Sequence, residues 1–264
     1  MKPVALGVSL LLLAWAVAQV VAVAQGATLR GEVGYDATFY ASLGQRFIET
    51  GELYFPAQFA GPYAGEGMVN LYPPLAMYLF VPFAFLPTVL WWAIPLGVLG
   101  WHLWSCRPAW WTWPLLAGIA ALLPTATALV YGNTILWSMA FVAVGLRYPA
   151  AAVLLALKPT DAIMWPLFVR RRSFWIGLAI VGLASLPFGV VWFDWVTALG
   201  NVEAGSPLRN VAGLPLLLLP VVAWSGRQRR SRLVTTNPTT RITTRTSQVK
   251  AIISKPFIDA AYPR

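Results

Sequence analysis

Cysteine and histidine are almost absent from this sequence, which has one of each among its 264 residues. The single Cys106 excludes an internal disulfide framework, and with the lone His102 it leaves too few ligands for structural zinc or haem. Acidic residues are also scarce, with nine Asp and Glu against 19 Lys and Arg, and charged residues make up 11% of the chain. So little charge argues against an ordinary soluble domain.

Apolar residues take the place of the missing charge. Hydrophobic residues make up 58% of the chain and include 14 tryptophans, which is typical of a protein solvated mostly by lipid. We therefore expect an all-α fold, a polytopic transmembrane helical bundle. The net charge of +10 would suit nucleic acid, an anionic membrane face or cytoplasmic loops. Because the arginines flank apolar segments, they favour cytoplasmic loops and no nucleic-acid partner.

The N-terminal quarter predicts one crossing followed by an external loop. Residues 3–24 form an apolar run long enough to cross a bilayer. It is either a first span or a signal peptide, since the charged start and Ala22-Val23-Ala24 also suit cleavage. Residues 26–72 hold five acidic residues, two arginines and no lysine, so we expect them outside the cytoplasm.

The rest of the chain predicts an interfacial segment and further crossings. Residues 73–87 contain Pro73, Pro74, Pro82 and Pro87, and we expect short helices there at the outer interface. Between the arginines at 147 and 170–172, two charges and a proline make an uninterrupted lipid-facing helix costly. If both arginine sites are cytoplasmic, this segment is a short hairpin with Lys158 near its far turn, whereas a single crossing would place one arginine site outside. The expected crossings are 88–104, 110–123 (ending at a break at 124–133), 134–146, 174–192 and 211–224, with an external loop at 193–210. Residues 1–224 would then be the membrane domain and 225–264 a disordered basic cytoplasmic tail.

Asp36 is the first candidate catalytic residue, because it lies on the expected external loop soon after the first span. Its carboxylate could act at the membrane surface as general base on a substrate hydroxyl. It could instead cap the helix that begins near Phe39. Spacing alone favours the cap.

Three further motifs follow along the chain. Tyr72-Pro73-Pro74 closes the loop and sets the direction of the interfacial helix. Gly132-Asn133 is ordinary turn chemistry between two spans. Lys158 could hold a lipid phosphate, or it could pair with Asp161 or reach to an interface, and the residues alone leave these alternatives open.

In this order the motifs resemble the polyprenyl-phosphate-sugar-dependent glycosyltransferases of the GT-C superfamily, most closely glycosyltransferase family 87. That family is similar in having one span, an external loop with an early Asp and a spaced Tyr, then G-x-x-Y, Y-P-P, a G-x-N turn and a later K-P. The matching residues here are Asp36 and Tyr40, Gly51-Glu52-Leu53-Tyr54, Tyr72-Pro73-Pro74, Gly132-Asn133 and Lys158-Pro159.

The resemblance implies a GT-C-like membrane enzyme, a hexosyltransferase. It would move a hexosyl group, by expectation mannosyl, from a polyprenyl-phosphate sugar to a glycolipid or cell-envelope glycan on the outer face of the plasma membrane. Asp36 would be the catalytic base, while Lys158 and Arg46 would hold the donor phosphate. No cofactor or metal site is implied; a divalent cation is compatible with the resemblance but not indicated by it. The residues expected to line the substrate site are Tyr35, Tyr40, Tyr72 and Asn133.

Two alternatives come from other classes. Typical members of that family continue with more spans, so a shortened, catalytically inactive protein of the same ancestry is one alternative. A small membrane transporter is the other, and it should show an internal repeat with matching Gly/Pro interruptions, which we do not find.

Overall fold

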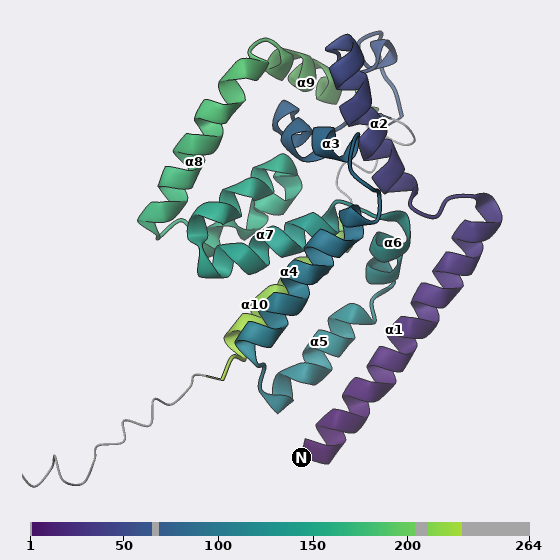
Figure 1. Ribbon diagram of the computed structural model, residues 1–264, viewed down its shortest axis with the longest axis vertical. Coiled ribbons are helices and arrows are strands. Elements are labelled where there is room, and N and C mark those ends of the chain that lie inside the picture. The colour runs from purple at the N-terminus through teal and green to yellow at the C-terminus, as the bar shows by residue number, and fades with distance from the viewer. Residues whose placement is uncertain (1, 65–68, 204–210, 229–264) are drawn as a thin grey trace, which may run out of the picture. The chain divides into compact units, whose positions relative to one another are not determined.

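The computed structural model describes residues 2–64, 69–203 and 211–228, and these ranges contain helices and no β-strand, which confirms the all-α class (Figure 1). The α-helices are α1 (Lys2–Arg30), α2 (Tyr35–Thr50), α3 (Met77–Phe83), α4 (Leu90–Cys106), α5 (Trp113–Ala120), α6 (Leu123–Tyr131), α7 (Ile135–Arg147), α8 (Arg172–Ser185), α9 (Val191–Gly200) and α10 (Leu218–Ser225). The 3-10 helices are η1 (Pro56–Gln58), η2 (Pro74–Ala76), η3 (Trp110–Thr112), η4 (Pro149–Leu157), η5 (Pro159–Leu167), η6 (Leu186–Phe188) and η8 (Val211–Leu217).

Helix α1 is the clearest candidate for a membrane span. Among the described residues it is the one unbroken helix that is long and apolar enough to cross a bilayer, with 29 residues. It lies along α5 and α6 (Figure 1), buries Ala16 and Ala27, and donates a hydrogen bond from the Gln19 side chain to the Ala121 carbonyl. Residues 3–24 are therefore packed against the rest of the protein as a span would be.

The other expected crossings are shorter or bent. Two helix pairs would raise the number of spans to three if each pair is one span: 110–120 with α6, bent by 64°, and 172–188 with α9, bent by 90°. Helix α4 has 17 residues, about 25 Å of helix against the roughly 30 Å of a bilayer core. The remaining crossings stay predictions.

Two loops expected from the sequence contain helix. The break expected at 124–133 is mostly α6, and the loop expected at 193–210 begins inside α9. In each case the interruption comes earlier, at residues 121–122 and at Gly189, whose φ is 38°. Of the expected tail, Ser225 ends α10, and residues 229–264 lie outside the described residues.

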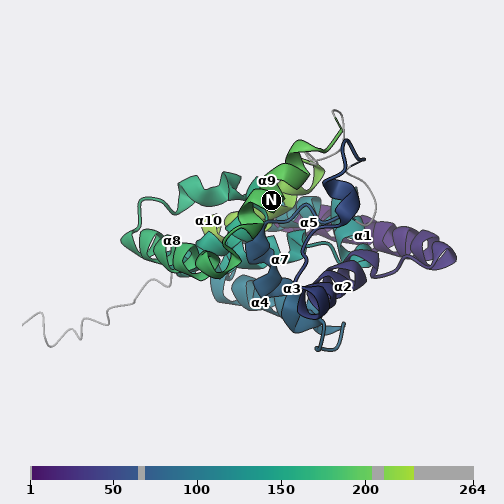
Figure 2. The ribbon, with the colours of Figure 1, turned by 90° about the horizontal axis from the view of Figure 1, so that it is seen from above.

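In the region expected outside the cytoplasm, α2 packs against α3, and the two helices lie side by side in Figure 2. Gly44 makes this possible, because a Cβ there would lie 2.6 Å from the Phe80 carbonyl oxygen. Aromatic rings fill the interface: Tyr40 stacks on Phe80 with ring centroids 4.9 Å apart and lies 5.4 Å from Trp91. This aromatic core fixes the first turns of α2, where Asp36 lies.

A second core joins α4, α7, η4, α8 and α10. The buried His102 ring in α4 lies 3.0 Å from the Pro220 carbonyl oxygen in α10. Helices η4 and η5 contact each other, and Lys158 is the single residue between them, with an extended backbone. The hairpin expected between the arginines at 147 and 170–172 stays a prediction.

Candidate functional site

The centre of the site is a contact between Asp36 and Asn133. The Asn133 amide Nδ2 donates a hydrogen bond to Asp36 Oδ2 over 2.7 Å, although the two residues are 97 positions apart. The other end of the same amide is also held, because Asn133 Oδ1 accepts a hydrogen bond from the Ile135 backbone N–H at 3.0 Å. Asn133 therefore lies two residues before the start of α7 at Ile135, with its amide nitrogen directed at the carboxylate.

Gly132 and one backbone hydrogen bond bring these residues together. The Gly34 N–H donates to the Val130 carbonyl at 2.9 Å, which joins the start of α2 to the end of α6. Gly132 has φ 74°, and a Cβ there would lie 2.8 Å from Ala37 Cβ and 2.7 Å from the Trp92 ring. Glycine is needed at this turn for both its backbone conformation and its lack of a side chain.

Asp36 does not cap α2. The N-cap position is Gly34, which makes no side-chain cap bond, and Asp36 lies in the first helical turn. The interpretation favoured by spacing is therefore wrong, because Asn133 supplies a tertiary partner for the carboxylate. Partial burial raises the pKa of Asp36 above its usual range, while the Asn133 hydrogen bond and the Lys158 charge act to lower it.

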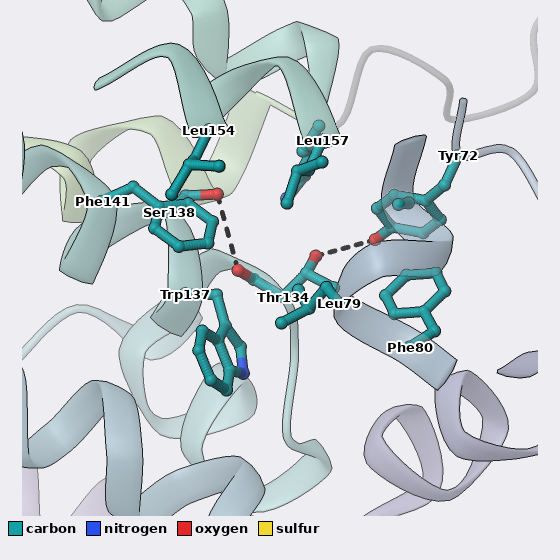
Figure 3. A pocket seen from close by; sticks show the side chains of 11 residues that line it. Tyr72, Leu79, Phe80, Thr134, Trp137, Ser138, Phe141, Leu154 and Leu157 are labelled. Atoms are coloured by element: carbon teal, nitrogen blue, oxygen red, sulfur yellow. Dashed lines mark hydrogen bonds between the residues drawn. The ribbon is translucent and has the colours of Figure 1, made fainter. Parts of the chain in front are cut away.

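Three hydroxyl groups form a chain beside this pair. Tyr40 Oη lies 3.0 Å from Tyr72 Oη. Tyr72 Oη lies 2.8 Å from Thr134 Oγ1, as Figure 3 shows. Tyr72 is fixed in turn by Tyr54, whose hydroxyl donates to the Tyr72 carbonyl at 3.0 Å. The structure thus explains two of the spaced tyrosines, because Tyr40 and Tyr54 both position Tyr72.

A small cavity opens next to this chain. Its volume is about 10 Å³, which is room for about one water molecule. Most of the lining residues are apolar, and the polar ones are Tyr72, Thr134, Ser138 and Lys158. Figure 3 shows the first three of these. The apolar side chains of the wall are Ala76, Leu79, Phe80, Trp137, Phe141, Leu154 and Leu157.

Lys158 is paired with Asp161, but loosely. The Lys158 Nζ lies 3.7 Å from Asp161 Oδ2, and the Asp161 side chain is 2% exposed. This separation is an ion pair beyond hydrogen-bond distance, and in the described part of the chain the buried Asp161 Oδ2 has no hydrogen-bond partner, so Lys158 supplies the opposite charge for it. Lys158 therefore has the structural partner that the sequence left open, and it also lines the cavity.

Two expected site residues lie apart from this cluster. Arg46 forms an ion pair with Glu52, and its guanidinium lies 4.8 Å from the centre of the Phe55 ring. It is nearly three turns along α2 from Asp36, about 15 Å. Tyr35 is beside Asp36 in the chain, but its side chain is exposed. The structure thus brings together Asp36, Tyr40, Tyr72, Asn133 and Lys158, and it does not bring Arg46 to them.

Thr134 is the site residue that sequence reasoning missed. It directly follows Gly132-Asn133, so its place in the turn was the available signal. Its side chain is buried, and its hydroxyl is the one that meets Tyr72. A threonine at a helix start is ordinary, and only the tertiary contact gives it a role.

Within the described ranges, no three His, Cys, Asp or Glu side chains are grouped as metal ligands would be. No family model, curated protein or solved structure matches this chain.

Proposed function

We propose that the protein transfers a hexosyl group from a polyprenyl-phosphate sugar to a glycolipid or glycan acceptor at the outer membrane surface. Mannosyl is the hexosyl group to be tested first. The observation that carries the proposal is the contact of Asp36 with Asn133 beside Lys158. Three motifs that are separate in the sequence supply a carboxylate, an amide that orients it, and a cation.

Asp36 suits the role of general base. Its carboxylate is partly exposed, so an acceptor hydroxyl can reach it, and its raised pKa makes it a stronger proton acceptor than a free aspartate. It takes the proton of the acceptor hydroxyl as that oxygen bonds to the anomeric carbon. The bond from the anomeric carbon to the phosphate oxygen breaks, and its electron pair leaves with polyprenyl phosphate.

Lys158 suits the leaving phosphate. Lys158 is one of the residues that line the mostly apolar cavity, and its ammonium would offset the negative charge that grows on the phosphate. The cavity itself is too small for a sugar. In this proposal the hexosyl group lies outside it, against Asp36.

The test is sugar transfer by purified Asp36→Asn protein. Asparagine keeps the shape but cannot take the proton, so transfer should fall on the order of a hundredfold to ten-thousandfold. Glu49→Gln is the matched control, because Glu49 is an exposed acid on the same helix that pairs only locally with Gln45. The assay supplies polyprenyl-phosphate mannose and follows the label into lipid, at equal concentrations of folded protein. Near-normal transfer by Asp36→Asn would contradict the assignment of Asp36 as the general base.

A further inference from the structure

One face of α9 and of the residue before it is apolar and exposed. Val190, Phe193 and Val196 follow one another at intervals of three residues, and each is between 61% and 74% exposed. Residues at this spacing lie on the same side of a helix. Exposed apolar side chains at similar intervals also run along α8 and η6, namely Ile176, Ile180, Leu183 and Leu186. Exposed apolar side chains thus continue from α8 onto α9.

Helix α9 runs across the direction of the candidate spans. It is bent by 90° from the helical segment 172–188 that precedes it. Figures 1 and 2 show α8 running in the same general direction as α1, which is the clearest candidate span, and α9 running across both. A bilayer crossed by α1 would therefore have α9 lying along its surface.

The opposite face of α9 is fixed to the region expected outside the cytoplasm, residues 26–72. Trp195 Nε1 donates a hydrogen bond to the Leu71 carbonyl at 3.1 Å. The Tyr63 hydroxyl donates to the Ala198 carbonyl at 2.7 Å. These two bonds hold the second half of α9 beside the external region, so the surface along which it lies is the outer one.

Asp194 limits how deep α9 can lie. Its side chain is exposed and follows Phe193 directly. A carboxylate that faces acyl chains is costly, whereas one at the level of the headgroups stays hydrated. Residues 186–203 contain no Lys or Arg, so attraction to anionic lipids does not hold this segment. The contact that remains is the apolar one.

We propose that α9 is an in-plane helix that inserts Val190, Phe193 and Val196 into the outer leaflet, at the boundary between headgroups and acyl chains. Its partner is the lipid bilayer, bound through apolar side chains and without preference for anionic headgroups. Helices of this kind bury their apolar face about 5–10 Å deep. Through the hydrogen bond to the Leu71 carbonyl, α9 also sets the height of the neighbouring Tyr72 relative to the membrane surface.

Depth measurements by electron paramagnetic resonance test this placement. In a Cys106→Ala background, Val190→Cys, Phe193→Cys and Val196→Cys each carry a nitroxide label, and the full chain is reconstituted in phosphatidylcholine nanodiscs. Oxygen concentrates among the acyl chains and a nickel chelate stays in water, so the ratio of their collision rates reports depth. All three labels should contact lipid at nearly the same depth. A helix that continued the span would instead separate the first label from the last by about 9 Å.

Helix α8 supplies the matched control. Ile176→Cys, Ile180→Cys and Leu183→Cys place the same label at exposed apolar positions of the neighbouring helix. Their depth should change steadily along α8, by up to about 10 Å in all. Replacing part of the phosphatidylcholine by the anionic phosphatidylglycerol should leave the α9 depths unchanged. Melting temperatures are compared with that of the Cys106→Ala protein to confirm that each labelled variant is folded.

A steady change of depth from Val190 to Val196 would overturn the in-plane helix, because α9 would then continue the span. So would contact of all three labels with water alone, or equal depths along α8, since α9 is in-plane only beside a helix that crosses. Depths on α9 that depend on phosphatidylglycerol would overturn the apolar contact. Sugar transfer plays no part in these measurements, so α9 can prove to be in-plane in a protein that transfers no sugar, and the reverse.

Discussion

The Asn133 amide holds the Asp36 carboxylate at 2.7 Å, and Lys158 is close enough to lower the pKa of the same group. A charged lysine and a hydrogen-bond donor thus counteract the burial that raises this pKa. Burial, the Asn133 hydrogen bond and the Lys158 charge therefore act together on this pKa, and substitutions can remove the last two separately.

The pH dependence of sugar transfer should report this balance. A general base works when ionised, so kcat/KM should fall on the acid side with an apparent pKa above the ordinary aspartate value of 3.8. Lys158→Gln removes a lowering influence and should move this limb to higher pH. Arg147→Gln makes the same charge change at the other end of α7, about 20 Å away along the helix, and should leave it in place. A limb that does not move in Lys158→Gln contradicts the assignment.

The same raised pKa has a defined effect on stability. The folded protein binds the Asp36 proton more tightly than the unfolded chain does, so this group contributes most below the unfolded pKa of 3.8. Its contribution falls as pH rises from there through the folded pKa. Asp36→Asn, which does not titrate, should lose less stability across that window, and this can be measured by thermal unfolding in detergent against pH.

The N-terminal helix should be retained in the mature protein. Gln19 bonds to the Ala121 carbonyl, and Arg30 donates to the Tyr131 hydroxyl at 2.8 Å, so both halves of α1 are tied to the α5–α6 pair. Intact mass of the purified protein should include residues 3–24. Gln19→Leu should cost about 1 kcal/mol of stability, whereas Gln25→Leu, at an exposed position, should cost little. A mature protein that begins after Ala24 would show a signal peptide instead.

Sidedness can be tested with single cysteines. Cys106 is 4% exposed, so its silence toward an impermeant maleimide would say nothing about the membrane side. Glu49 and Ser105 are both exposed, so a cysteine at either position can react. In a Cys106→Ala background, Glu49→Cys should react in whole cells because residues 26–72 are predicted to lie outside. Ser105→Cys should react only after permeabilisation because it is near Arg107, which is predicted to lie inside. Labelling of Ser105→Cys from outside would reverse the predicted orientation.

The packing of α2 on α3 should depend on Gly44. A Cβ there would lie 2.6 Å from backbone oxygen, which cannot give way as a flexible side chain can, so Gly44→Ala should cost about 1–3 kcal/mol. Gly97→Ala meets nothing within 4 Å and should be neutral or slightly stabilising, because alanine favours helix. Thermal unfolding of the two variants makes the comparison, and equal melting temperatures would show that α2 and α3 can separate without loss.

The sequence by itself determined the class of this protein. Scarce charge and long apolar runs are properties of composition, so the all-α fold and the span at α1 could be predicted without any contact. The turn at Gly132 could be predicted as well, because the conformation that favours glycine is a local property. Crossing lengths were predicted less well, since apolar character does not show where a helix bends, as it does between α5 and α6.

Only the tertiary structure decided what the polar residues do. Spacing favoured Asp36 as a helix cap, and a partner 97 positions away replaced that role. Arg46 and Lys158 had the same predicted task, yet one pairs with Glu52 and the other lines the cavity. Thr134 has no role that the sequence indicates, and its place in the site comes from the contact of its hydroxyl with Tyr72. The energy of a buried polar group depends on its partners, and the partners are chosen by helix packing, which no local pattern records.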